Sequence, residues 1–197
     1  MSWKKTLLVS TAVAALALPA GAQSFGLGGS VGLVDNVGNG VTDGFKHSEV
    51  TGWVDFQFEK TALLRLTFGS MRTQQTNAGQ TVSTPDGGGL LTVPAQFKER
   101  INYTTIGVSY LWWEGFFTSG LIGGIGGYHF IPDTLPPQYA PYGDQRETVF
   151  GFHLGTEAIF RVFKNTFIVG RLTYHQVLAQ PKTRQFLNAD VGAEIRF

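Results

Sequence analysis

Apolar and polar positions alternate without interruption over the last eleven residues of the chain. The odd-numbered positions from Leu187 to Phe197 are all apolar, whereas Asn188, Asp190, Glu194 and Arg196 lie between them. Successive side chains of a β-strand point to opposite faces, so this segment predicts a strand with one apolar face and one polar face. A soluble β-sandwich could also contain such a strand, so the class of fold has to be judged from the rest of the chain.

The same period of two recurs along the chain and predicts eight strands. In the second of them, Val50 and Phe56 alternate with Glu49 and Asp55. The fifth strand is so rich in glycine that both of its possible registers remain open. The predicted strands cover residues 24–34, 48–59, 62–72, 99–112, 116–131, 148–161, 166–178 and 187–197.

Strand length and loop length together indicate a membrane protein. Most predicted strands have about 10 to 14 residues, whereas a typical soluble strand has about 5 or 6 and a tilted transmembrane strand about 9 to 11. Short connections at 60–61, 113–115 and 162–165 alternate with longer ones at 35–47, 73–98 and 132–147 and a modest one at 179–185.

Transmembrane barrels have short periplasmic turns and longer external loops, and a sheet in lipid must close because open edges leave backbone groups unpaired. The sequence therefore predicts an all-β fold, an eight-stranded antiparallel up-and-down transmembrane β-barrel, with both termini in the periplasm.

Aromatic residues form two groups along the predicted strands, as expected for the two water interfaces of a membrane barrel. The group predicted for the periplasmic rim is Phe25, Phe56, Phe58, Tyr110, Trp112, Trp113, Phe116, Phe117, Phe160, Phe163 and Phe197. The group predicted for the opposite rim is Tyr103, Tyr128, Phe130, Phe150, Tyr174 and Phe186.

The first 22 residues have the pattern of an export signal. Lys4 and Lys5 precede an apolar run at 7–18, and the small residues at 20–22 form a cleavage site. A membrane-anchoring helix is the alternative, but the apolar run has about a dozen residues, fewer than the roughly 20 that span a bilayer. We therefore expect a cleaved signal peptide at 1–22 and one barrel domain at 23–197.

Composition narrows the function further. Loss of Lys4 and Lys5 with the signal would change the formal charge from +1 to −1, which gives no reason to expect nucleic acid as a partner. The chain has no cysteine, which excludes disulfides and thiolate metal sites. The 26 glycines and 16 phenylalanines suit a tightly curved sheet with a lipid-facing rim.

Acids and bases share the face that the register turns inward. An eight-stranded barrel has an interior just wide enough for side chains or one small ligand, so these charges should pair and form a polar plug. The alternative is a gated path for ions or small solutes, lined by Asp55, Arg65, Glu157 and Arg171. The predicted interior network consists of Asp55, Arg65, His153, Glu157, Arg161, Arg171, Asp190, Glu194 and Arg196, with Gln57, Glu59 and His175 on the same face.

Two long loops are candidates for binding an extracellular ligand. The loop at 73–98 contains an apolar stretch at 89–93, which could extend the wall as a hairpin or contact a partner. Exposed loops commonly carry recognition residues, and proline makes them stiff. The loop at 132–147 has a stiff, aromatic composition through Pro136, Pro137, Tyr139, Pro141 and Tyr142.

Four features of the chain are typical of one known family: the export signal, the glycine-aromatic first strand at 24–33, the run at 123–130 and the terminal segment at 187–197. Through these features the chain resembles the small eight-stranded outer-membrane β-barrels of the OmpX, OmpW and OmpA-barrel group. The resemblance implies a monomer in lipid and lipopolysaccharide of the outer membrane. It also implies that the barrel-assembly machinery reads Val191, Ile195 and Phe197. Unlike full-length OmpA-type proteins, the chain ends at the barrel, so we expect no cell-wall tether.

Some barrels of this group modify lipid A, so an enzyme must also be considered. A hydrolytic site would need a serine close to a histidine and an orienting acid. His175 is followed by Gln176 and Val177 and lacks the family's nearby serine, and the neighbours His47 and Ser48 should face opposite sides of a strand. We therefore expect no catalytic residue, no cofactor and no metal site.

Overall fold

The computed structural model describes residues 24–37, 44–76, 81–83, 90–92, 96–114, 116–132, 147–179 and 183–197. The predicted signal peptide lies outside these residues. No helix in the described part of the chain has the length and apolarity needed to cross a bilayer.

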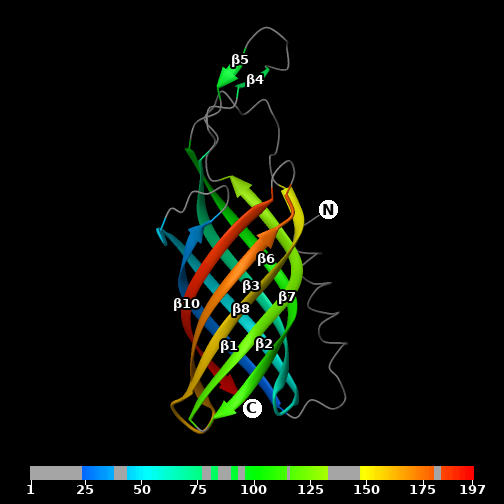
Figure 1. Cartoon of the computed structure of the whole chain (residues 1–197), viewed down its shortest axis with the longest axis vertical. Helices are drawn as coiled ribbons and strands as arrows, with labels where there is room; N and C mark the ends of the chain where they lie inside the picture. The colour runs from blue at the N-terminus through cyan, green and yellow to red at the C-terminus, as the bar shows by residue number, and fades with distance from the viewer. Residues whose placement is uncertain are drawn as a thin grey trace.

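Eight long strands close into one antiparallel barrel (Figure 1). Around the barrel their order is β1, β10, β9, β8, β7, β6, β3 and β2, so each strand lies beside its neighbours in the chain and β1 closes on β10. This confirms the predicted eight-stranded up-and-down barrel. The strands are β1 (Ser24–Asn36), β2 (His47–Glu59), β3 (Ala62–Thr76), β6 (Gln96–Glu114), β7 (Phe117–Pro132), β8 (Glu147–Arg161), β9 (Thr166–Val177) and β10 (Arg184–Arg196).

Two short strands, β4 (Thr81–Ser83) and β5 (Leu90–Thr92), form a separate antiparallel pair within the β3–β6 connection. Strand β5 falls in the apolar stretch at 89–93, for which a hairpin was one of two predicted outcomes. Figure 1 shows this pair beyond the end of the barrel.

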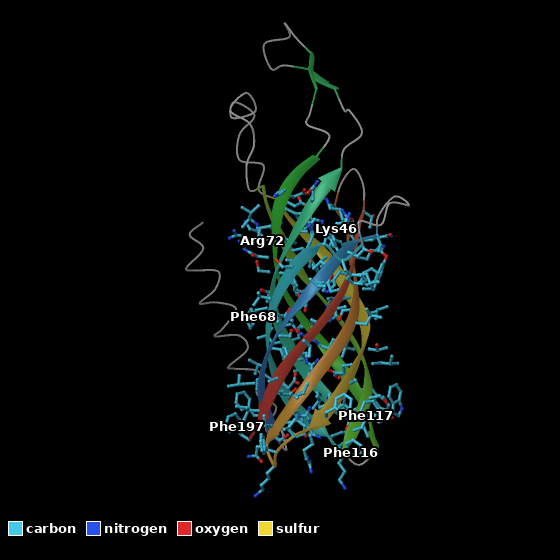
Figure 2. The ribbon with its side chains drawn as sticks, turned by 90° about the vertical axis from the view of Figure 1, so that its left-hand side faces the viewer. Lys46, Phe68, Arg72, Phe116, Phe117 and Phe197 are labelled. Atoms are coloured by element: carbon cyan, nitrogen blue, oxygen red, sulfur yellow. The ribbon has the colours of Figure 1, made fainter. Side chains whose placement is uncertain are left out.

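The two ends of the barrel differ. We call the end that holds the short β2–β3, β6–β7 and β8–β9 connections the turn end, and the opposite one the loop end. Phe197 lies at the turn end together with Phe116 and Phe117 (Figure 2). There the backbones of Phe25 and Phe197 exchange hydrogen bonds of 3.3 and 2.8 Å, which join the first strand to the last residue.

The structure settles the register of the glycine-rich strand β7. Tyr128 and Ile122 point inward and are buried, whereas Leu121 and Ile125 are exposed on the outer face. Gly124 faces inward, where a Cβ would lie 2.7 Å from the His153 ring and 2.8 Å from the Ile106 carbonyl oxygen. Glycine is therefore needed where a neighbouring side chain and strand approach this closely.

The outer wall is apolar over most of its height. At least one large apolar side chain is 39% or more exposed on every long strand, which is the surface that a lipid environment requires. Examples on successive parts of the wall are Val31, Val50, Ile106, Leu121, Leu154, Leu172 and Val191.

The predicted second aromatic girdle is wrong for four of its six residues. Tyr103, Tyr128, Phe130 and Phe186 are buried inside the barrel near the loop end. Phe150, which is 52% exposed, and Tyr174, which is half-buried, lie on the outer face. Aromatic rings at inward positions fill the lumen and do not face lipid. The girdle was predicted from how far along its strand each ring lies, and this distance does not show which face of the strand carries the ring. At the turn end, by contrast, Phe116, Phe163 and Phe197 are exposed as predicted.

Candidate functional site

The inside of the barrel is divided into layers. A loop-end layer of buried apolar and tyrosine side chains and a turn-end layer of apolar side chains lie on either side of a charged layer. The loop-end layer contains Val34, Met71, Ile101, Tyr103, Tyr128, Phe130, Val177 and Phe186. The turn-end layer contains Trp53, Leu63, Leu111, Ile159, Phe167 and Val169.

Strand β3 shows the order of the layers, because Leu63, Arg65 and Met71 face inward one after another along it. A polar plug of paired charges was predicted, without apolar layers. The structure adds these layers, since polar and charged side chains dominate the middle of the barrel and apolar side chains fill both ends. An eight-stranded barrel is narrow enough for side chains alone to fill its interior in this way.

Arg65 is the centre of the charged layer. Its Nε and Nη2 each donate to one carboxylate oxygen of Asp55 at 2.7 Å, and its Nη1 donates to Glu157 Oε2 at 2.7 Å. Asp55 is its direct cross-strand neighbour on β2, whereas Glu157 comes from β8 beyond β6 and β7. Ser109 also donates to Glu157. Arg65 therefore ties distant parts of the wall together through the lumen.

Trp53 joins the charged layer to the turn-end layer. The guanidinium of Arg171 lies 4.1 Å from the centre of the Trp53 ring, and that of Arg65 lies 5.4 Å from it. The indole Nε1 donates to Glu194 Oε2 at 3.3 Å. A guanidinium over an indole face is a favourable cation–π contact, and burial strengthens it. Sequence reasoning missed Trp53, although it occupies an inward position between Thr51 and Asp55.

Arg171 forms a second set of bonds in the charged layer. Its Nε donates to Asp190 Oδ1 at 2.9 Å and its Nη2 to Ser30 Oγ at 2.6 Å, so it connects β9 with β10 and β1. Nearer the loop end, the Tyr103 hydroxyl and the Asn188 amide both donate to Glu49 Oε1, at 2.5 and 2.7 Å. Buried charges here are paired or hydrogen-bonded, as low-dielectric surroundings require.

An ion pair crosses the barrel at the loop end. Arg184 Nη1 lies 2.7 Å from both carboxylate oxygens of Glu99, although β10 and β6 stand on opposite sides of the ring of strands. The Arg184 guanidinium also lies 4.2 Å from the centre of the Phe130 ring, and Thr73 donates to Glu99 at 3.1 Å. This bridge covers the loop-end layer. The sequence did not predict this ion pair, because Arg184 lies in the segment 179–185 that was predicted to be a loop.

The structure brings most of the predicted interior residues together. Asp55, Arg65, Glu157, Arg171, Asp190 and Glu194 form the charged layer described above. His153 is buried among them, with its ring centre 5.5 Å from that of His175. Arg196 pairs with Glu194 and lies 4.6 Å from the centre of the Phe167 ring.

Two predicted inward residues are not part of this network. Arg161 is exposed, with its guanidinium 5.6 Å from the centre of the Phe167 ring, and Glu59 is exposed as well. Both are the last residues of their strands and lie beyond the turn-end layer, where water replaces the partners that a buried charge needs. The prediction that Arg161 belongs to the interior network is therefore wrong.

The charged layer contains a cavity of about 20 Å³ between Glu49, His153 and Arg171, enough for roughly one water molecule. Within the described residues, no group of three or more His, Cys, Asp and Glu side chains is arranged to hold a metal ion. Ser48 is exposed on the outer face, whereas His47 is the cross-strand partner of Val34, which is buried inside, so His47 and Ser48 face opposite sides as predicted.

The residues predicted to guide assembly lie on the outer face near the end of β10. Val191 and Ile195 are exposed among the apolar residues of the wall. Phe197 is exposed and stacks on Phe25, with 5.7 Å between ring centres. Recognition of these side chains by the assembly machinery stays a prediction.

A closed eight-stranded barrel with an apolar outer wall and a filled interior defines the architecture of the small outer-membrane barrels, and solved structures agree. The chain matches neisserial surface protein A with a TM-score of 0.61 at 11% identity, covering 88% of this chain and 97% of that one. It matches OprG from Pseudomonas aeruginosa with a TM-score of 0.61 at 10% identity, covering 89% and 96%.

A third match is Ail, the attachment invasion locus protein of Yersinia pestis, solved in complex with the heparin analogue sucrose octasulfate. Its TM-score is 0.56 at 10% identity, covering 88% of this chain and 98% of that one. No family model matches the sequence, and no curated protein is similar enough to count as a relative. The fold is thus that of the small outer-membrane β-barrels, with a sequence far from these examples.

Proposed function

We propose that this protein is an outer-membrane barrel that does not conduct solutes and that presents its long loops to the cell exterior. In this orientation the turn end, where Ser24 and Phe197 lie, faces the periplasm. Short periplasmic turns and longer external loops are the rule for bacterial barrels of this kind. The apolar outer wall supports placement in lipid, and the filled lumen supports a role for the loops rather than for the interior.

The observation that carries a non-conducting role is the stacking of three barriers across the lumen. The Arg184–Glu99 bridge, the loop-end layer and the Arg65 network follow one another from the loop end inward. A hydrated ion would have to displace paired buried charges and cross apolar layers on both sides of them. Each of these steps is costly.

We expect the purified barrel to be silent in planar lipid bilayers, apart from the baseline of protein-free membranes. A porin inserted into the same bilayer provides the positive control, and a heat-modifiability gel shows that the barrel is folded. Unitary current steps that scale with salt concentration and change in Arg171→Ala or Glu157→Ala would contradict the proposal and establish a narrow channel instead.

The loop at 133–146 supports a surface-binding role through its sequence, because it combines prolines with Tyr139 and Tyr142. Tyrosines on a stiff segment supply contact area at a low entropic cost. Its structure lies outside the described residues. Because the similar fold of Ail was solved with a sulfated ligand, sulfated polysaccharide belongs among the surfaces to be tested, together with extracellular matrix proteins.

We expect cells that display the barrel to adhere to at least one of these coatings, and we expect replacement of 135–142 by an equally long Gly/Ser segment to reduce that adhesion to the level of cells without the barrel. Replacement of 82–89 by the same Gly/Ser segment provides the matched loop control, with surface amounts equalised. Equal adhesion of cells with and without the barrel to every coating would count against a surface-binding role.

A further inference from the structure

Two histidines face each other inside the barrel. His153 on β8 and His175 on β9 are direct cross-strand partners, and their ring centres are 5.5 Å apart. Both side chains point into the lumen, where His153 is 7% exposed and His175 is 3% exposed. We call these two residues the histidine pair. The pair lies where the charged layer meets the loop-end layer, since Tyr128 of the loop-end layer bonds to His175.

Neighbouring side chains and backbone hold both rings in place. The Tyr128 hydroxyl oxygen lies 2.9 Å from Nδ1 of His175, and the ring centre of Tyr103 lies 5.2 Å from that of His175. The His153 ring packs against the backbone of β7, where a Cβ on Gly124 would lie 2.7 Å from its Cε1 atom. This packing keeps both imidazoles away from water.

The acids nearest the histidine pair already have partners. Glu49 and Asp190 line the small cavity of the charged layer together with the pair. Glu49 accepts hydrogen bonds from Tyr103 and Asn188. Asp190 accepts one from Arg171. Within the described residues, neither imidazole forms an ion pair with a carboxylate. A proton on either ring would therefore add a buried positive charge without a counter-charge.

Other positive charges face the histidine pair. Arg65 on β3 and Arg171 on β9 line the same cavity as the two imidazoles. Two protonated rings directly opposite each other on adjacent strands would also repel. Ion pairs with Arg65 or with one another engage the remaining charged groups of the layer, which are Asp55, Glu157, Glu194 and Arg196. Protonation of the histidine pair inside the folded barrel is therefore costly.

We propose that the histidine pair makes the barrel sensitive to acid, because the folded interior excludes the protons that these two side chains bind once the barrel unfolds. A histidine in an unfolded chain takes up a proton near pH 6.5. Below this pH the unfolded state binds more protons than the folded state, so the free energy of unfolding falls as the pH falls. The stabilisation is complete above about pH 6.5 and is lost progressively in acid.

Urea unfolding of the barrel from lipid vesicles, at about pH 7 and at about pH 5, tests the proposal. The readout is the factor by which the unfolding equilibrium constant rises between the two pH values, in which pH-independent changes in stability cancel. Each histidine that the folded barrel keeps unprotonated contributes about 25-fold to this factor. We therefore expect the factor to be about 25-fold smaller in His153→Gln than in the wild type, and about 600-fold smaller in His153→Gln/His175→Gln.

His129→Gln provides the matched control on the outside of the barrel. His129 follows the inward-facing Tyr128 on β7, so its side chain points outward, where its Nδ1 lies 2.7 Å from Thr148 Oγ1 at an exposed site. An exposed histidine binds its proton similarly in the folded and unfolded states, so it contributes little to the difference between them. We expect the factor for His129→Gln to stay within about threefold of the wild-type factor.

NMR of isotopically labelled histidine rings in the folded barrel reads the charge of the pair directly. At about pH 5 the signals of His153 and His175 should be those of neutral imidazole. Imidazolium signals from the pair would overturn the proposal, even if a variant failed to fold. Equal factors for the wild type, His153→Gln and His129→Gln would also overturn it and would assign the acid sensitivity to the carboxylates. Conductance and adhesion are measured at neutral pH, so failure here leaves the proposed function open to its own tests.

Discussion

Replacement of Arg65 by methionine is expected to lower the free energy of unfolding by about 3–5 kcal/mol, because it leaves buried carboxylates without their counter-charge. Asp55 and Glu157 each lie 2.7 Å from the Arg65 guanidinium and are almost fully buried. Methionine has a similar bulk to arginine, so the change in the free energy of unfolding reflects the lost charge and not a new cavity. Urea unfolding from lipid vesicles, followed by tryptophan fluorescence, measures the change.

Arg161→Met provides the matched control at the exposed turn end, and we expect it to change the same free energy by about 0.5 kcal/mol or less. Neutralising the acids as well, in Arg65→Met/Asp55→Leu/Glu157→Gln, should recover most of the loss, since apolar replacement of a whole buried ion network is often tolerated. Equal effects of Arg65→Met and Arg161→Met would show that the Arg65 network does not stabilise the barrel.

Trp53→Ala is expected to cost about 3–5 kcal/mol of unfolding free energy, the range for removing a large buried aromatic side chain. Trp53 is 2% exposed and contacts the guanidinium groups of both Arg171 and Arg65, so its loss opens a cavity and leaves two cations without their aromatic partner. The bond from Nε1 to Glu194 is lost as well. Thermal unfolding in the same vesicles, followed by circular dichroism, measures the change.

Two variants separate the contributions to this effect. Trp53→Phe keeps an aromatic face for Arg171 but removes the donor to Glu194, so it should cost less than alanine. Trp112→Ala removes a tryptophan that is 43% exposed on the outer face and should cost clearly less than Trp53→Ala. If the two alanine variants destabilise the barrel equally, the contacts of Trp53 with the two arginines provide no special stabilisation.

The sequence was sufficient to predict the barrel because each step of the fold is local. Alternation sets the two faces of a strand, and short turns pair consecutive strands, so the topology follows from neighbours in the chain. Strand β7 was the exception, because glycine at both sets of alternate positions removes the contrast between its faces. Its register is fixed by long-range packing, such as the close approach of Gly124 and His153.

The layers of the interior could not be predicted in the same way. Met71, Leu63 and Trp53 are apolar residues at inward positions, where their neighbours on the same face are charged or polar. The alternation pattern therefore treats them as exceptions, and it does not show at which level along the barrel axis each side chain lies. Arg184 and Glu99 meet across the lumen although they are 85 residues apart in the chain. Contacts of this kind depend on the closed ring and on side-chain length, neither of which is visible in a local pattern.

The seam between β1 and β10 has a consequence for how the protein is made. Because β1 pairs with β10, two backbone edges remain unpaired until β10 has been added, and in hydrocarbon each unpaired backbone group costs several kcal/mol. A prematurely terminated polypeptide would have no partner for β1 and could not remain stably in the bilayer. Closure of the ring therefore requires that synthesis has proceeded through β10.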